Sequence, residues 1–311
     1  MGHADRHGAS VILCYFFSYL LFSLLTKIQG AQHGPAGVLL TSAIGNALAW
    51  GVALALTGWW RLLRRGVSHG ALVAGASSLL IVASSVVVYG EPRLSIVLPL
   101  LLMKGGVVLV GRGADFLRGR AVDARTRTVM LLTCAAVVAG VAPRLRLDGT
   151  AVALACAALY LAGYAVKLPA LDAGKRDPLP FLVAETTVTT LLLLACCLPL
   201  AADDSARAAV TPLAVLAGMA SCGCGAFGGL ILLRPAPHSL LVPLSRCTSL
   251  LAGLCASWLW IRVSTGRWHL DPWELAGASL MACALWVGSK RPQNPSQEAQ
   301  EGASPVGGMV R

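Results

Sequence analysis

Long apolar runs, separated by short polar or charged breaks, dominate the sequence. Each run is close to the roughly 20 residues that an α-helix needs to cross the hydrocarbon core of a bilayer. Charged residues, proline or glycine mark the ends of the runs. The ten runs cover residues 9–28, 35–59, 69–89, 94–111, 127–142, 149–168, 178–201, 210–233, 238–261 and 272–289. The pattern therefore predicts an all-α integral membrane protein with ten transmembrane helices.

The composition agrees with this pattern. Of the 311 residues, 56% are hydrophobic and 13% are charged, and the mean hydropathy is +0.72. An ordinary soluble domain has about 25% charged residues. Ten crossings use roughly 200 residues, which leaves no room for a soluble catalytic domain. The first run is followed by no cleavage motif, so we expect it to stay in the mature protein as the first span.

The sequence carries no motif for catalysis or for a metal. All ten cysteines lie in apolar runs and form no Cys-x-x-Cys pair, so we expect small buried hydrophobic residues rather than a zinc site or disulfides. A phosphate-binding loop and a catalytic triad are also missing from the sequence. We therefore expect no cofactor, no metal ion and no enzymatic activity.

Lysine and arginine are distributed unevenly between the two sides that ten crossings define. Sixteen, with Lys167 among them, lie on the side of the N-terminus, and seven, with Lys27 among them, lie on the opposite side. The remaining two, Lys104 and Arg246, lie deep inside the runs. Because cytoplasmic loops carry the excess of positive charge, we expect both termini in the cytoplasm of a bacterial inner (plasma) membrane. Basic loops over anionic lipid explain the net charge of +11 without a nucleic-acid partner. The polar tail, residues 292–311, is predicted to be disordered and cytoplasmic.

Two weak internal matches indicate that the chain is a duplication. An offset of 141 residues aligns Tyr19 with Tyr160, and an offset of 144 aligns Pro99 with Pro243. A unit of five spans is odd, so its copy must enter the membrane from the other side. Such inverted repeats are typical of secondary transporters. The expected units are residues 1–147 and residues 148–291.

A Trp-x-x-x-Gly element, Trp273 to Gly277, leads into the last predicted span. Together with ten spans in a 5+5 arrangement and two cytoplasmic ends, this element resembles the drug/metabolite transporter superfamily. The likeness is to its EamA-like and nucleotide-sugar-transporter-like branches, and it covers nearly the whole chain. It implies a secondary transporter that works by alternating access.

Three ionisable residues lie deep inside predicted spans, where a charge at the bilayer centre costs about 2.5 kcal/mol or more. Lys104 and Arg246 lie about ten and eight residues into two repeat-related spans, so they reach a similar depth from opposite sides. Transporters built from inverted repeats bind their substrates near this level. We therefore expect Lys104 and Arg246 to form an anion site. The alternative is that one or both form a buried salt bridge with Glu185.

Several other residues are candidates for the same site. Glu185 lies among threonines and either carries protons or neutralises Arg246. Ser249 shares a small, polar helix face with Arg246, so we expect it to line the same cleft. The rings of Tyr19 and Tyr160 either stack on a substrate ring or pack in the core. Small residues between 218 and 229 are instead predicted to let two helices pack closely.

The sequence thus predicts a secondary transporter of a small polar metabolite that is anionic or phosphorylated. A membrane-embedded lipid-carrier flippase and a transferase are the alternatives. A transferase is expected to cluster Asp, His or Glu at a membrane face, whereas only Asp203 and Asp204 form such a pair, in a predicted outer loop. The expected partners are a small-molecule substrate and the lipid bilayer, and a homodimer is left open.

Overall fold

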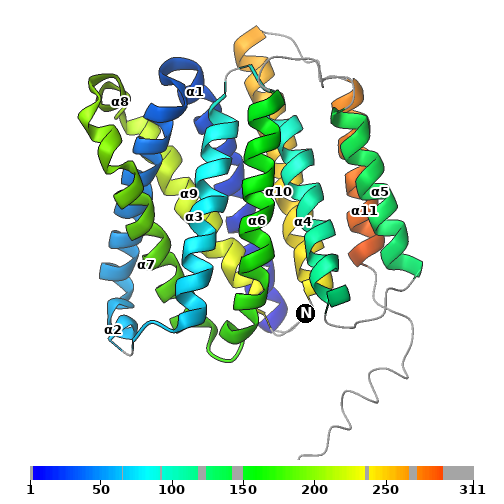
Figure 1. Cartoon of the computed structure of the whole chain (residues 1–311), viewed down its shortest axis with the longest axis horizontal. Helices are drawn as coiled ribbons and strands as arrows, with labels where there is room; N and C mark the ends of the chain where they lie inside the picture. Colours follow the sequence, from blue (N-terminus) through cyan, green and yellow to red (C-terminus); the bar gives the residue numbers. More distant parts are fainter. Residues whose placement is uncertain are drawn as a thin grey trace, which may run out of the picture.

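The computed structural model is a bundle of helices (Figure 1). It describes residues 3–64, 66–91, 93–117, 124–141, 150–234, 238–265 and 272–289, and these residues contain no β-strand. In chain order the elements are α1 (His3–Thr57), α2 (Trp60–Leu63), α3 (His69–Gly90), α4 (Val97–Leu117), α5 (Ala124–Val141), α6 (Thr150–Gly174), α7 (Pro178–Cys197), the 3-10 helix η2 (Leu198–Ala202), α8 (Asp204–Ala208), α9 (Pro212–Leu232), α10 (His238–Thr265) and α11 (Pro272–Ser289). Each predicted apolar run overlaps a helix, and two of the runs share α1, so the all-α prediction is confirmed. The tail, 292–311, and the boundary at 147/148 lie outside the described residues.

Helix α1 is one element along the chain but two helices in space. Gly34 breaks it with φ 71° and ψ 173°, a backbone conformation that glycine adopts without strain. Pro35 follows and cannot donate the backbone hydrogen bond that would continue the first half. The two halves correspond to the runs 9–28 and 35–59, and Figure 1 shows them running in opposite directions along the bundle.

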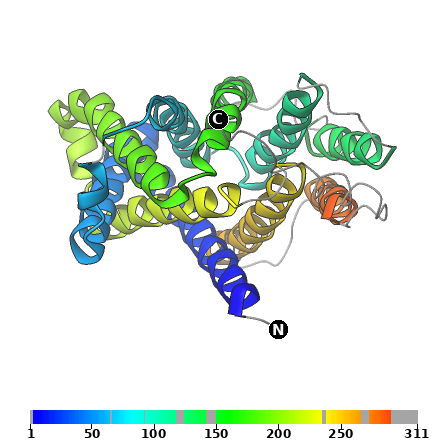
Figure 2. The ribbon, with the colours of Figure 1, turned by 90° about the horizontal axis from the view of Figure 1, so that it is seen from below.

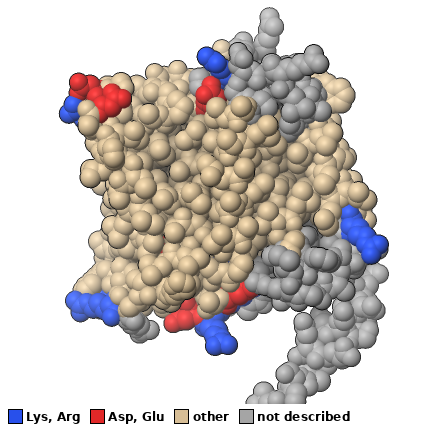
Figure 3. Space-filling model, in the orientation of Figure 1, with Lys and Arg blue, Asp and Glu red and all other residues tan. Residues whose placement is uncertain are grey.

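The outer surface of the bundle is apolar. Five helical segments are long and apolar enough to cross a membrane: Ser10–Thr57, His69–Gly90, Ala151–Gly174, Pro178–Ala202 and Pro212–Leu232. Large hydrophobic side chains point outward, such as Leu56, Leu131 and Val263, which are more than two thirds exposed. Figure 3 shows a wide uncharged belt on one face, with charged side chains near the two ends, over α2 and α8. This distribution is what a surface in contact with lipid requires.

Polar side chains cap the helices at the ends of the bundle. The Ser68 and Thr211 hydroxyls accept hydrogen bonds from the backbone N–H groups of Ala71 and Ala214. Asp203 caps α8 in the same way, and its hydrogen bonds from Ser205 lower the pKa of its carboxyl below the usual value. These caps satisfy backbone donors that helix beginnings leave unpaired.

Glycines allow α1 and α9 to pack closely. A Cβ atom added at Gly218 would lie 2.7 Å from the backbone oxygen of Ser42 and 2.8 Å from the Cα of Gly45. Both neighbours are backbone atoms, which cannot move aside as a flexible side chain can. The prediction that small residues of this segment serve close helix packing is therefore confirmed at Gly218.

Replacing Gly218 with valine is therefore expected to lower the free energy of unfolding by about 1–3 kcal/mol or more, because the helices must separate. Gly51→Val is the matched control, since Gly51 is exposed on α1 and has no neighbouring atom within 4 Å of its Cβ position. Thermal unfolding of both variants in detergent measures the difference. Equal stabilities would contradict this account of the α1–α9 contact.

The bundle has a peripheral pair and a central group of helices. Helices α5 and α11 pack against each other at one side, far from α2 and α8 (Figures 1 and 2). In the central group α3 packs against α6, α4 packs against α6 and α10, and α1 packs against α9 and α10. This central group surrounds the internal cavity described below.

Candidate functional site

A cavity of about 90 Å³ lies inside the bundle. Its walls come from α1, α3, α4, α6, α7, α9 and α10, whereas none of the described side chains of α5 and α11 lines it. Its polar and charged lining consists mainly of Tyr15, Tyr19, Asn46, Ser78, Ser85, Lys104, Tyr160, Tyr164, Lys167, Glu185, Thr186, Thr189, Ser221, Ser245 and Arg246. Such a concentration of polar groups inside an apolar bundle is typical of a binding site.

Lys104 and Arg246 lie close together in the wall of the cavity. Lys104 Nζ donates to the hydroxyl of Tyr160 at 2.5 Å, and one terminal nitrogen of Arg246 approaches the same hydroxyl at 3.2 Å. The other terminal nitrogen of Arg246 donates to Tyr164 at 2.8 Å. The two cations are 4% and 1% exposed. The structure thus brings together the two residues that the sequence predicts at similar depth.

Aromatic rings surround these two cations. Lys104 Nζ lies 4.7 Å from the ring centre of Tyr19 and 4.9 Å from that of Tyr160. The guanidinium of Arg246 lies 4.6 Å from the ring centre of Tyr164. Cations are attracted to the faces of aromatic rings at these distances. Tyr19 and Tyr160 are buried and also line the cavity. Their positions are therefore compatible both with core packing and with contact with a ligand.

Neither cation forms an ion pair with a carboxylate of the described residues. Among the described residues, Lys104 and Arg246 form hydrogen bonds with tyrosines, and the Nε of Arg246 is buried without a hydrogen-bond partner. Hydroxyls and rings satisfy part of the hydrogen bonding but do not balance the charge. An anion that enters the cavity can supply what is missing.

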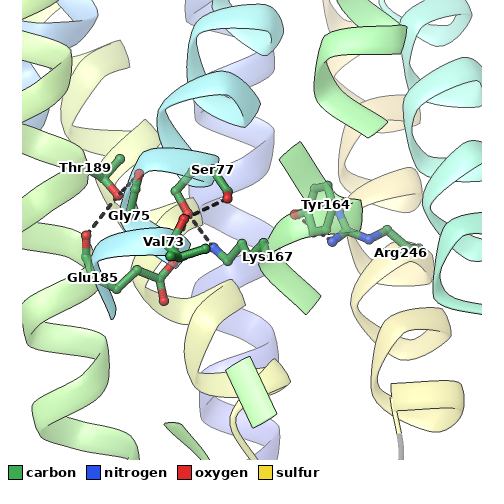
Figure 4. Close-up of polar contacts among 9 residues, drawn as sticks. Val73, Gly75, Ser77, Tyr164, Lys167, Glu185, Thr189 and Arg246 are labelled. Carbon is green, nitrogen blue, oxygen red and sulfur yellow. Dashed lines mark hydrogen bonds and ion pairs between the residues drawn. The ribbon is translucent and has the colours of Figure 1, made fainter. Parts of the chain in front are cut away.

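Glu185 has a different partner from the one that the sequence predicts. Its Oε1 lies 2.5 Å from Lys167 Nζ, and the Ser78 hydroxyl donates to the same oxygen at 2.9 Å. Lys167 also donates to Ser78 at 2.7 Å. Figure 4 shows the side chains of Lys167 and Glu185 on one side of α6, while those of Tyr164 and Arg246 lie on the other. The predicted alternative of a salt bridge between Glu185 and Lys104 or Arg246 is therefore wrong.

Two lysines assigned to loops from the sequence are buried in the bundle. Lys167 is 7% exposed, because α6 continues to Gly174 instead of ending near residue 168. Lys27 is 2% exposed and donates to the backbone carbonyls of Glu91 and Leu94, between α3 and α4. Lys27 and Lys167 therefore do not belong in the count of basic residues in the loops on the two sides. The excess of positive charge at the predicted cytoplasmic side remains after this correction.

Ser249 lies apart from the cavity. Its hydroxyl is buried and donates to the backbone carbonyl of Arg246 in the same helix at 3.1 Å. The same helix face packs against α4 further along, because a Cβ at Gly253 would lie 2.1 Å from the Leu100 side chain. The neighbour of Arg246, Ser245, lines the cavity in place of Ser249.

The sequence reasoning also missed Ser78, Asn46 and Lys167 as lining residues. Tyr160, Tyr164 and Lys167 recur at steps of four and three, which places them on one face of α6. This spacing could have identified Lys167. Among the described residues, no group of three or more His, Cys, Asp or Glu side chains is arranged to hold a metal ion.

Comparisons with known proteins bear on the fold. No family model matches the chain, and no curated protein matches it. Fifteen solved chains are similar in structure. One of them, described only as "Crystal structure of protein", has a TM-score of 0.54 and 20% sequence identity, and the match covers 90% of this chain and 98% of that chain. This likeness shows that the helical fold occurs in a solved protein of similar extent, and it shows the fold alone.

Proposed function

We propose that the protein is a secondary transporter that carries a small organic anion across a bacterial inner membrane. The observation that carries this proposal is the pair Lys104 and Arg246, two buried cations that face an internal cavity without a carboxylate partner among the described residues. The resemblance of the sequence to the drug/metabolite transporter superfamily, with its EamA-like and nucleotide-sugar-transporter-like branches, supports the same conclusion.

Electrostatic repulsion makes the empty site unfavourable. Lys104 Nζ and the Arg246 nitrogen lie 2.5 and 3.2 Å from one oxygen, so they are at most about 6 Å apart. Two like charges at this distance repel by about 3 kcal/mol at an effective dielectric constant of ~20. An anion between them converts this repulsion into two attractions. The Lys167–Glu185 pair is already balanced, so the cavity retains an excess of positive charge.

Equivalent helix contacts support a repeat of five spans. Gly75 on α3 lies against Val188 and the backbone oxygen of Glu185 on α7. Gly218 on α9 lies against Gly45 and the backbone oxygen of Ser42 on α1. The paired positions are separated by the same 143 residues (218 − 75, 188 − 45 and 185 − 42). This offset falls between the two offsets found by aligning the sequence with itself, 141 and 144.

Ten crossings follow if every apolar helix spans the membrane. The kink at Gly34 divides the 48-residue segment Ser10–Thr57 into two halves, each of which has the length of one crossing. The positively charged end of the bundle, with Arg61 on α2 and Arg64 directly after it, would face the cytoplasm by the rule for basic loops. Both termini then lie in the cytoplasm, and α8 lies outside.

Anions are expected to stabilise the purified protein against heat, because a ligand that binds only the folded state raises its stability. At a concentration of about 100 times the dissociation constant the gain is about 2.7 kcal/mol. A panel of carboxylates, organic phosphates and nucleotide sugars, each compared with a neutral amide or ester of similar size, would measure this gain as a shift in Tm. Equal shifts for anions and neutral compounds would contradict the proposed anion site.

A further inference from the structure

Two buried polar atoms of opposite kind lack a partner at the cavity. The Nε of Arg246 is a donor without an acceptor, and Oε2 of Glu185 is an acceptor without a donor. Both side chains are more than nine-tenths buried. Figure 4 shows them on opposite sides of α6, with Tyr164 beside Arg246 and Lys167 beside Glu185. A buried group that lacks its hydrogen bond costs free energy, so a ligand that satisfies both atoms is favoured.

We propose that the transported anion carries a hydroxyl group at its other end, and that Glu185 selects it by accepting a hydrogen bond from that hydroxyl. This inference rests on the proposed function, since it takes Arg246 and Lys104 as the site of the anionic group. Glu185, whose charge Lys167 balances, then determines which anions bind and does not neutralise Lys104 or Arg246. The cavity wall also offers hydroxyl and amide groups from Ser78, Thr186 and Asn46.

The size of the cavity limits the ligand further. An engineered apolar cavity of about 150 Å³ holds one benzene molecule, which has six non-hydrogen atoms. In this conformation a cavity of about 90 Å³ therefore takes a ligand with only a few such atoms. A phosphate group alone would use most of this space. The cavity thus favours short carboxylic acids that carry one hydroxyl.

A hydroxyl fits the Glu185 end better than an ammonium group does. Lys167 already neutralises Glu185 at 2.5 Å, so an ammonium would face the positive charge of Lys167 as well as the carboxylate. It would also lose its water on entering the cavity without gaining a free counter-charge. A neutral hydroxyl donor avoids both costs, and a ligand with net negative charge balances the excess of positive charge at Lys104 and Arg246.

Three matched series of acids test this inference on the wild-type protein in detergent. The hydroxy acids are glycolate, β-hydroxypropionate and γ-hydroxybutyrate, the unsubstituted acids are acetate, propionate and butyrate, and the amino acids are glycine, β-alanine and γ-aminobutyrate. At the best chain length the hydroxy acid is expected to bind roughly ten- to hundred-fold more tightly than its unsubstituted counterpart, which is the effect of one hydrogen bond to a charged group. The amino counterpart is expected to bind more weakly than the hydroxy acid.

A double variant tests the role of Glu185. Glu185→Gln combined with Lys167→Met keeps the cluster neutral and is expected to reduce the preference for the hydroxyl to less than about threefold, because the carboxylate acceptor is gone. Asp204→Asn removes a carboxylate that pairs with Arg207 at the surface and is the matched control, which should keep the preference. If the double variant does not fold, the wild-type series decides alone.

The possible outcomes separate this inference from the proposed function. Equal binding of hydroxy and unsubstituted acids, abolished by Arg246→Gln, would overturn the role of Glu185 and leave the anion site standing. Tighter binding of the amino acids would overturn the choice of a hydroxyl. Binding of larger anions but none of these acids would overturn the size limit, and binding of no anion at all would overturn both proposals.

Discussion

Replacing Arg246 with glutamine is expected to weaken binding of the transported anion by roughly ten- to hundred-fold. A hydrogen bond between a buried cation and an anion contributes about 1.5–3 kcal/mol, and 1.4 kcal/mol corresponds to a factor of about ten in affinity. Lys104→Gln should have an effect of similar size, because both cations lie at the same tyrosine hydroxyl. Ligand-dependent thermal stability of the purified variants measures both losses.

Two further variants control this experiment. Arg246→Lys should restore binding only in part, since an ammonium keeps the charge but loses the planar group that grips a carboxylate with two parallel hydrogen bonds. Arg207→Gln removes an exposed arginine of the α8 ion pair and should bind like the wild type. Wild-type affinity in folded Arg246→Gln and Lys104→Gln would end the assignment of the anion site.

The largest loss of stability is expected when the Lys167–Glu185 pair is broken. Lys167→Met or Glu185→Gln alone leaves one charge buried without its partner, which costs about 3–5 kcal/mol of the free energy of unfolding. The double variant leaves no charge in the cluster and should recover most of that loss. Unfolding of the three variants in detergent forms a double-mutant cycle for the pair.

The same cycle distinguishes the partner of Glu185. Glu185→Gln combined with Arg246→Gln should not recover stability, because Arg246 contacts tyrosines and lies across α6 from Glu185. Recovery of stability by that combination, and none by Glu185→Gln with Lys167→Met, would contradict the ion pair between Lys167 and Glu185.

Proton transport by Glu185 stays a prediction. The pH dependence of uptake by the Glu185→Gln variant would test it.

The positions of the helices could be predicted because lipid imposes a simple rule on them. A segment that faces lipid must be apolar over its whole length, so the breaks at charged residues, proline and glycine mark its ends. The Gly34–Pro35 pair shows this well, since it separates two runs in the sequence and kinks α1 in the structure. The arrangement of the helices around a cavity depends on side-chain packing between segments that are far apart in the sequence. The pattern of apolar runs does not specify this packing.

The charged site could be predicted only in part. Depth along a helix follows from counting residues, so Lys104 and Arg246 could be placed at one level. Lys167 was missed because the apolar run ends near it, whereas α6 extends seven residues further to Gly174. Glu185 lies seven residues after the beginning of α7 at Pro178. A short loop joins the two helices, so both residues lie at the same height, and this argument could have paired them.

Ser249 illustrates the remaining limit. Its spacing from Arg246 correctly places it near that residue on α10, but a helix face can meet a cavity at one turn and a neighbouring helix at the next. The packing of Gly253 against Leu100 shows that this face meets α4 further along. Only the arrangement of the whole bundle determines where a polar face opens into the cavity.

The most direct test of the central claim is counterflow in sealed proteoliposomes. Vesicles loaded with an unlabelled anion that stabilises the protein receive a trace of the labelled anion outside, and a carrier then accumulates label transiently above its equilibrium level. We expect this transient accumulation with the wild-type protein, and we expect it to disappear with Arg246→Gln at equal incorporation. Entry of label no faster than in protein-free vesicles, or equal accumulation by both proteins, would contradict a carrier that binds its anion at Arg246.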